Sequence, residues 1–130
     1  MSAGPVAGGR PEDGSVPGGR HVLIHANGED AASLATALRV ARQAALELEA
    51  GTRFHVVVQG ALVRRLTVGG EAADDVNGTV SDTVSVAACR NSMDRVGVSE
   101  GELLPAVGTV PSAGAYLAAC QWDGWAYLRY

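Results

Sequence analysis

The segment HVLIHANGED, residues 21–30, joins an apolar run to a turn, and a long helical pattern follows it directly. Its first six residues suit a strand that is buried on both faces, as in a parallel sheet. Its last four predict a turn that offers Asn27 or Asp30 as a helix N-cap. From residue 31 to residue 50, leucine and alanine repeat at helical spacing, and Gly51 follows as a stop signal. A strand followed at once by a helix is typical of an α/β protein.

The alternation of strand and helix continues to the end of the chain. Residues 69–81 combine several acids with Gly69-Gly70 and Asn77-Gly78, which is compatible with either a frayed helix or a mobile loop. Pro111 is expected at the first position of the last helix. The pattern predicts a three-layer α/β sandwich around a mostly parallel five-stranded sheet. Further strands are expected at 53–59, 83–89, 107–110 and 125–130, and helices at 60–68, 90–96 and 111–122.

The composition indicates one domain. A chain of 130 residues with 47% hydrophobic residues is large enough for a core without metal or disulfide support. Residues 1–19 are rich in Gly, Pro, Ala and Ser without periodicity, so we expect a disordered N-terminal tail followed by a domain over 20–130.

Charge and hydropathy argue against several classes of partner. A net charge of −4 with scattered arginines is unfavourable for binding nucleic acid. No apolar run approaches the roughly 20 residues that a membrane span needs. Residues 1–19 also lack the apolar stretch of a signal peptide, which predicts a cytoplasmic location. In that reducing compartment the two cysteines are expected to be free thiols.

The carboxyl ends of parallel strands share one edge of a sheet, where functional groups collect. The expected strands end at Asn27, at Gln59-Gly60, at Cys89 and at the Val110-Pro111 junction. Asn27, Gln59, Gly60 and Pro111 are therefore candidates for lining a pocket at this edge.

Cys89 is the candidate catalytic residue. It ends a strand and precedes a helix, where backbone N–H groups and the helix dipole favour a thiolate, and Arg90 adds a positive charge. The alternative is a buried, inert cysteine that packs as a small apolar side chain. Cys120, inside the last expected helix, is interpreted as such a packing residue.

The histidines do not show a metal-ligand pattern. His21 and His25 are four residues apart on one strand, too far for simple chelation, and His55 is on another strand. His25 could approach Cys89 and influence its protonation, or form a structural hydrogen bond. No glycine-rich phosphate loop is present, and no metal or cofactor is expected. The aromatic residues of the C-terminal segment could line a ligand site or pack in a core or subunit interface.

Several segments, in order, resemble the single-domain branch of the DsrE/DsrF-like family, which is related to sulfur-relay proteins. The most specific are the cysteine-led ACRNSM and the ending QWDGWAYLR. One departure is Gln59, which stands where relatives often have His. The matching segments are HANGED (25–30), VQGALVR (58–64), ACRNSM (88–93), LLP (103–105), VPSA (110–113) and QWDGWAYLR (121–129).

The resemblance implies a parallel α/β sandwich that assembles as a homo-oligomer, a trimer or hexamer, and a cysteine that carries sulfur as a persulfide. Cys89 occupies that position. The first hypothesis is therefore a sulfur carrier in which Arg90 and the backbone donors of Asn91 and Ser92 stabilise the anion, with sulfur donor and acceptor proteins as partners. The second is a non-enzymatic ligand-binding or assembly module with Cys89 in the pocket wall. A small hydrolase or reductase ranks last, because no acid–base constellation accompanies the cysteine.

Overall fold

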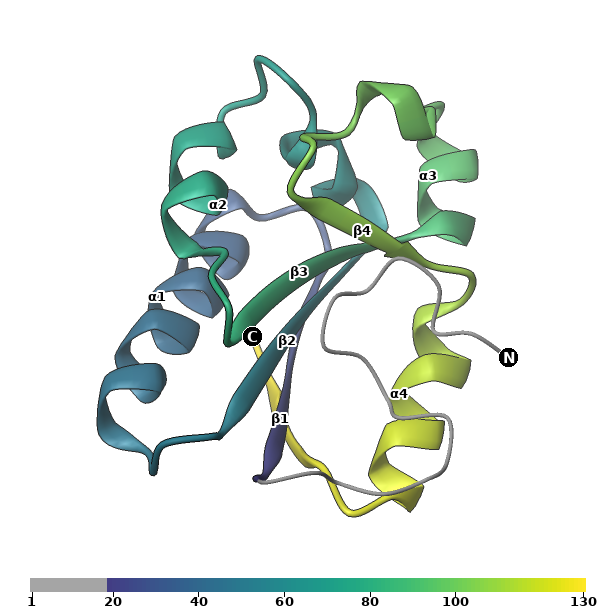
Figure 1. Cartoon of the computed structure of the whole chain (residues 1–130). Coiled ribbons are helices and arrows are strands. Elements are labelled where there is room, and N and C mark those ends of the chain that lie inside the picture. The colour runs from purple at the N-terminus through teal and green to yellow at the C-terminus, as the bar shows by residue number, and fades with distance from the viewer. Residues whose placement is uncertain (1–18) are drawn as a thin grey trace.

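The computed structural model describes residues 19–130 (Figure 1). The predicted tail, apart from Gly19, lies outside the described residues. The chain alternates between strand and helix throughout. Its elements are β1 (His21–Asn27), α1 (Ala31–Glu47), β2 (Arg53–Gln59), the 3-10 helix η1 (Gly60–Leu66), α2 (Ala73–Thr79), β3 (Val84–Cys89), α3 (Arg90–Val96), the 3-10 turn η2 (Glu100–Glu102), β4 (Val107–Val110), α4 (Ala113–Trp122) and β5 (Ala126–Arg129).

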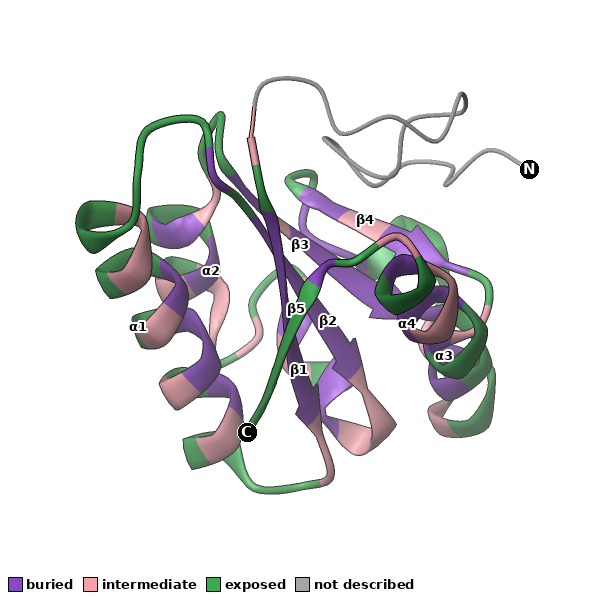
Figure 2. Ribbon diagram, turned by 90° about the horizontal axis from the view of Figure 1, so that it is seen from below, coloured by how far each residue is buried: buried purple, intermediate pink, exposed green. Residues whose placement is uncertain are grey.

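The five strands form one sheet in the order β4-β3-β2-β1-β5, and every neighbouring pair is parallel. Helices α1 and α2 lie on one side of the sheet and α4 lies on the other (Figure 2). The predicted α/β sandwich is confirmed, and the sheet is parallel throughout.

Alternation along each strand supplies two apolar layers, one on each face of the sheet. In β3, Val86 and Ala88 belong to the core cluster beneath α1 and α2, whereas Ala87 and Cys89 belong to the cluster beneath α4. The central strands are therefore continuous apolar runs, as expected for a sheet buried on both faces. Among residues 19–130, no helix has both the length and the apolar character required to cross a bilayer.

Helix α1 begins as its sequence predicts and ends earlier. The Asp30 carboxylate accepts a hydrogen bond from the Ala32 N–H at 2.9 Å, which caps the first turn. The helix stops at Glu47 because Leu48 has an extended backbone, so Gly51 (φ 93°) lies in the following loop and does not end the helix.

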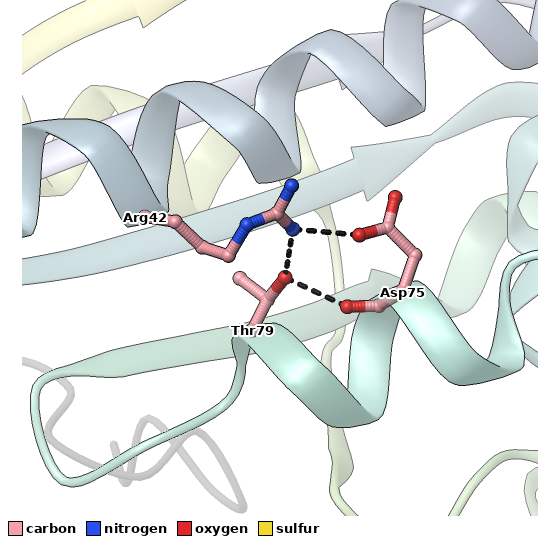
Figure 3. A network of polar contacts seen from close by, with 3 residues as sticks. All are labelled: Arg42, Asp75 and Thr79. Carbon is pink, nitrogen blue, oxygen red and sulfur yellow. Dashed lines mark hydrogen bonds and ion pairs between the residues drawn. The ribbon is translucent and has the colours of Figure 1, made fainter.

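Residues 69–81 contain a helix, α2, over Ala73–Thr79. Arg42 of α1 donates to the Asp75 carboxylate and to the Thr79 hydroxyl of α2, both at 2.6 Å (Figure 3). The Thr79 hydroxyl donates in turn to the Asp75 carbonyl at 2.7 Å. These contacts join two segments far apart in the sequence, which local propensity could not indicate.

The last helix begins two residues later than expected. Ser112 is its N-cap, with the Ser112 hydroxyl accepting from the Ala115 N–H at 3.5 Å, and the helix starts at Ala113. Pro111 therefore precedes the cap and is exposed, in place of occupying the first helical position. The helix starts after Ser112 because the serine hydroxyl accepts a hydrogen bond from a helical N–H group, which a proline side chain cannot do.

Candidate functional site

The carboxyl ends of four strands meet at one edge of the sheet. The register pairs Asn27 of β1 with Gln59 of β2, and Cys89 of β3 with Val110 of β4. The predicted convergence of these positions therefore holds in the fold. It follows from the parallel arrangement, which places every strand-to-helix turn on the same side.

Cys89 lies at this edge, at the end of β3, in a cradle of hydrogen-bond donors. Burial raises the pKa of the Cys89 thiol. Hydrogen bonds to the sulfur from the Ser92 hydroxyl and from the backbone N–H groups of Ser92, Ala113 and Asn91 have the opposite effect. Together these bonds outweigh burial, so the pKa lies below its ordinary value. Two of these N–H groups come from the start of α3 and the third from the start of α4. The arrangement favours the thiolate.

Ser92 connects the cysteine to the neighbouring turn. Its hydroxyl accepts a hydrogen bond from the Gly60 N–H at 2.8 Å and bonds the Cys89 sulfur. Gly60 has a left-handed φ of 77°, and a Cβ there would lie 3.0 Å from both the Asn27 side-chain oxygen and the Gly28 carbonyl oxygen. Glycine at position 60 is therefore required for the close approach of the β1 and β2 turns.

The Cys89 thiol is covered by protein. The residue is 2% exposed and packs beneath α4 in the same cluster as Ala113 and Cys120. A pocket of about 320 Å³ opens at the same edge and reaches Ser92, and its wall also includes Gly60 and Arg95. Sequence reasoning missed Arg95; its only signal is its place one helical turn beyond Ser92.

The other predicted residues have different surroundings. The Arg90 guanidinium donates hydrogen bonds to the Glu100 carboxylate and to the Thr109 hydroxyl, both at 2.9 Å. These two hydrogen bonds hold the guanidinium in place. Asn91 contributes its backbone N–H, while its side chain is exposed. Pro111 is exposed, two residues before the Ala113 N–H that bonds the thiol.

His25 forms hydrogen bonds to residues other than Cys89. Its Nε2 lies 2.8 Å from the Gln59 side-chain oxygen, and its Nδ1 lies 2.7 Å from the Tyr127 hydroxyl. Burial lowers the pKa of His25, an effect opposed by the hydrogen bond to Gln59 and reinforced by Arg129, and the net pKa is below the ordinary value. The structure therefore brings His25 to Gln59, and Gln59 follows Val58, which pairs with Ala88, the residue before Cys89.

A second polar cluster lies on the same face, toward the opposite end of the strands. His21 Nδ1 is 2.9 Å from His55 Nε2, His55 Nδ1 is 3.2 Å from the Ser85 hydroxyl, and the Trp125 indole stacks on both imidazoles. Within the described residues, no group of three or more His, Cys, Asp or Glu side chains is placed to hold a metal ion.

No protein-family model and no curated protein matches the sequence. Solved structures that share the fold include two from microbial proteins. A protein of unknown function from Methanobacterium thermoautotrophicum, MTH1491, is 27% identical with a TM-score of 0.79, and the YchN protein of E. coli is 19% identical with a TM-score of 0.63. Each alignment covers 85% of this chain and 99% of the other. The fold is therefore of the DsrE/YchN-like α/β class.

Proposed function

We propose that the protein is a sulfur carrier that holds sulfur as a persulfide on Cys89. The observation that carries the proposal is the cradle of the Ser92 hydroxyl and three backbone N–H groups around the Cys89 sulfur, which lowers the pKa of the thiol despite its burial. A packing cysteine requires no such donors, whereas a nucleophilic thiolate does. The DsrE/YchN-like fold is compatible with this role.

The transfer step needs only the thiolate and a persulfide donor. The Cys89 thiolate attacks the outer sulfur of a donor R–S–SH, the new S–S bond forms, and the donor's S–S bond breaks with its electron pair leaving on R–S⁻. The cradle stabilises the attacking thiolate beforehand and receives the Cys89 sulfur again when an acceptor thiol removes the outer sulfur. No external oxidant or reductant is consumed.

The burial of Cys89 sets the kind of reactant that can reach it. At 2% exposure the thiol should react with slender sulfur nucleophiles and electrophiles more readily than with bulky ones. Sulfur donor and acceptor proteins would have to present a flexible, cysteine-bearing segment to this edge. The proposed cytoplasmic location would keep the resting thiol reduced.

The test is persulfide loading followed by mass spectrometry of peptides. Incubation of the protein with cysteine persulfide should add one sulfur, about 32 Da, to the Cys89 peptide by thiolate exchange. Cys89→Ser should abolish the adduct, and Cys120→Ser, which removes a fully buried thiol in the last turn of α4, should retain it. Ser92→Ala should raise the pH at which Cys89 is alkylated at half its maximal rate, because the lost hydroxyl bond lowered the thiol pKa. Preferential labelling of Cys120, or no adduct on Cys89, would contradict the proposal.

The second candidate is a ligand-binding module in which Cys89 only supports the pocket wall. The low exposure of the thiol favours this alternative, as does the pocket of about 320 Å³ that reaches Ser92 without including Cys89 in its lining. It becomes the better account if Cys89 resists both loading and small alkylating reagents in the folded protein.

A further inference from the structure

A chain of three side chains crosses the sheet toward the cysteine. The Tyr127 hydroxyl of edge strand β5 lies 2.7 Å from His25 Nδ1 on β1, and His25 Nε2 lies 2.8 Å from the Gln59 side-chain oxygen on β2. His25 is 7% exposed, so these two hydrogen bonds replace those that its ring nitrogens would otherwise make with water.

The partners of His25 fix which nitrogen carries the proton. The Gln59 carbonyl oxygen can only accept a hydrogen bond, so His25 Nε2 must be the N–H donor. Because the imidazole is neutral near pH 7, Nδ1 then has a lone pair and accepts the Tyr127 O–H. The hydrogen bond from the Tyr127 hydroxyl therefore stabilises the same tautomer of His25 that this orientation of the Gln59 amide requires.

The orientation leaves the other half of the amide free. The Gln59 oxygen is turned toward β1, and within residues 19–130 its –NH₂ group makes no hydrogen bond. Val58 and Ala88 are the last paired residues of β2 and β3, and Gln59 and Cys89 are the next residue on each of these strands, which lie about 4.8 Å apart. Both side chains point to the α4 face, as their positions two residues beyond Val57 and Ala87 require.

We propose that the Gln59 –NH₂ group binds the outer sulfur of the Cys89 persulfide, and that His25 and Tyr127 are positioning residues that hold the amide for it; this inference rests on the proposed function. The cradle of Ser92, Asn91 and Ala113 already surrounds the inner sulfur. The transferred sulfur lies one S–S bond, about 2.05 Å, beyond it and carries the negative charge, so it needs a donor of its own. Gln59 is a neighbouring side chain whose –NH₂ group makes no hydrogen bond within residues 19–130.

Two substitutions separate the amide from its support. Gln59→Leu removes the donor. Tyr127→Phe keeps the ring and removes only the hydroxyl, which frees the imidazole to move its proton to Nδ1 and lets the Gln59 amide turn its oxygen toward the outer sulfur. Tyr130→Phe is the matched control, because Tyr130 is as exposed as Tyr127, at 37%, and bonds His25 only through the backbone.

The experiment measures alkylation rates against pH for the full chain, before and after loading with cysteine persulfide. In Gln59→Leu and in Tyr127→Phe the pH midpoint of the persulfide should rise by roughly one unit, a tenfold change, because a hydrogen bond to a charged sulfur is lost. The midpoint of the resting Cys89 thiol should not move in Tyr127→Phe, and Tyr130→Phe should match the wild type in both measurements.

The outcomes are distinguishable. Normal loading with an unshifted persulfide midpoint in both variants would overturn the role of Gln59 and leave the sulfur carrier standing. Equal shifts in the resting thiol and in the persulfide would show that Gln59 acts on the inner sulfur and would also overturn the inference. A wild-type protein that cannot be loaded at all would overturn the proposed function and this inference together.

Discussion

At the scale of single residues, the site depends on contacts that join separate turns. Ser92 accepts from Gly60 and bonds Cys89, so the β2 turn and the thiol are held by one hydroxyl. Gly60 in turn approaches Asn27 and Gly28 so closely that a Cβ would lie only 3.0 Å from an oxygen of each, which would force a shift of the neighbouring atoms. The donors around Cys89 are therefore preorganised by backbone packing as well as by the cysteine's own helix.

Gly60→Ala should weaken both the fold and the site. A left-handed φ of 77° combined with Cβ contacts of 3.0 Å to Asn27 and Gly28 should cost about 1–3 kcal/mol in the free energy of unfolding. Displacement of the Gly60 N–H from the Ser92 hydroxyl should also raise the pH midpoint of Cys89 alkylation. Urea unfolding and alkylation kinetics measure the two effects.

Gly114→Ala is the control for this substitution. Gly114 lies in α4 with no atom within 4 Å of an added Cβ, so alanine should stabilise the helix by about 0.5–1 kcal/mol. If both alanine variants unfolded at the same urea concentration, the close approach at Gly60 would not be a constraint.

At the scale of elements, α2 and β5 depend most on their neighbours. Helix α2 is short and has no side-chain N-cap, and its polar attachment to α1 is the Arg42, Asp75 and Thr79 network (Figure 3). Strand β5 is exposed along its length and, among residues 19–130, pairs only with β1. The sequence predicts the strand at the position of β5 but leaves residues 69–81, which contain α2, undecided between a helix and a loop.

Thr79→Val should loosen α2. The Thr79 side chain is buried, and valine keeps its shape but loses the bonds to Arg42 and to the Asp75 carbonyl, so the free energy of unfolding should fall by about 1 kcal/mol. Hydrogen exchange of the α2 amides should accelerate. Arg42→Gln should act in the same direction, while Arg39→Gln, on an exposed position of α1, should have no effect. Unchanged α2 exchange in both Thr79→Val and Arg42→Gln would contradict this role for the network.

At the scale of the whole molecule, the α4 face differs in chemistry from the α1 and α2 face. The α1 and α2 face is built from aliphatic side chains, Phe54 and Met93, whereas the α4 face contains all three histidines together with Cys89, Cys120 and Trp125. Buried histidines couple the stability of the fold to pH.

Stability should fall below pH 6.5. Burial, with His21 and Arg53 nearby, lowers the pKa of His55 to about 3, so the folded protein excludes a proton that the unfolded chain binds below pH 6.5. The free energy of unfolding should therefore decrease by about 1.4 kcal/mol per pH unit between pH 6 and pH 4 from this group, with His21 adding in the same direction. Urea unfolding at several pH values measures the slope.

His55→Gln should flatten this slope, because the titrating group is gone. Ser85→Ala keeps the imidazole and removes only its hydroxyl partner, so it should keep the wild-type slope. Parallel stability curves for the wild type and His55→Gln would show that another group causes the acid sensitivity.

The protein is expected to form a homo-oligomer, a trimer or hexamer, through its C-terminal segment. Trp122 is 84% exposed at the end of α4, and Tyr127, Leu128 and Tyr130 expose 37–38% of their surfaces along edge strand β5. Such an apolar edge is unfavourable in a monomer. Light scattering should give a molar mass that is a multiple of 13.3 kDa. Trp122→Arg should lower this mass, and Val68→Arg, at another exposed apolar position, should leave it unchanged. A wild-type mass of 13.3 kDa at micromolar concentration would contradict the expectation.

The sequence by itself determined the order of strands and helices along the chain, the parallel character of the sheet, and the edge of the sheet where Cys89 meets the ends of the other strands. These features follow from local signals: apolar runs, helical spacing, turn residues and the geometry of strand–helix–strand connections. It also placed β2, α3 and β4 at the residues where the structure has them.

Only the tertiary structure decided how side chains from different strands pair. His25 forms hydrogen bonds with Gln59 and Tyr127, which are 34 and 102 residues away, and Arg90 donates hydrogen bonds to Glu100 of η2 and to Thr109 of β4. The Ala113 N–H reaches Cys89 because β3 and β4 are neighbours in the sheet. No local pattern encodes these contacts, since each depends on strand order and register, which are set by how the whole core packs.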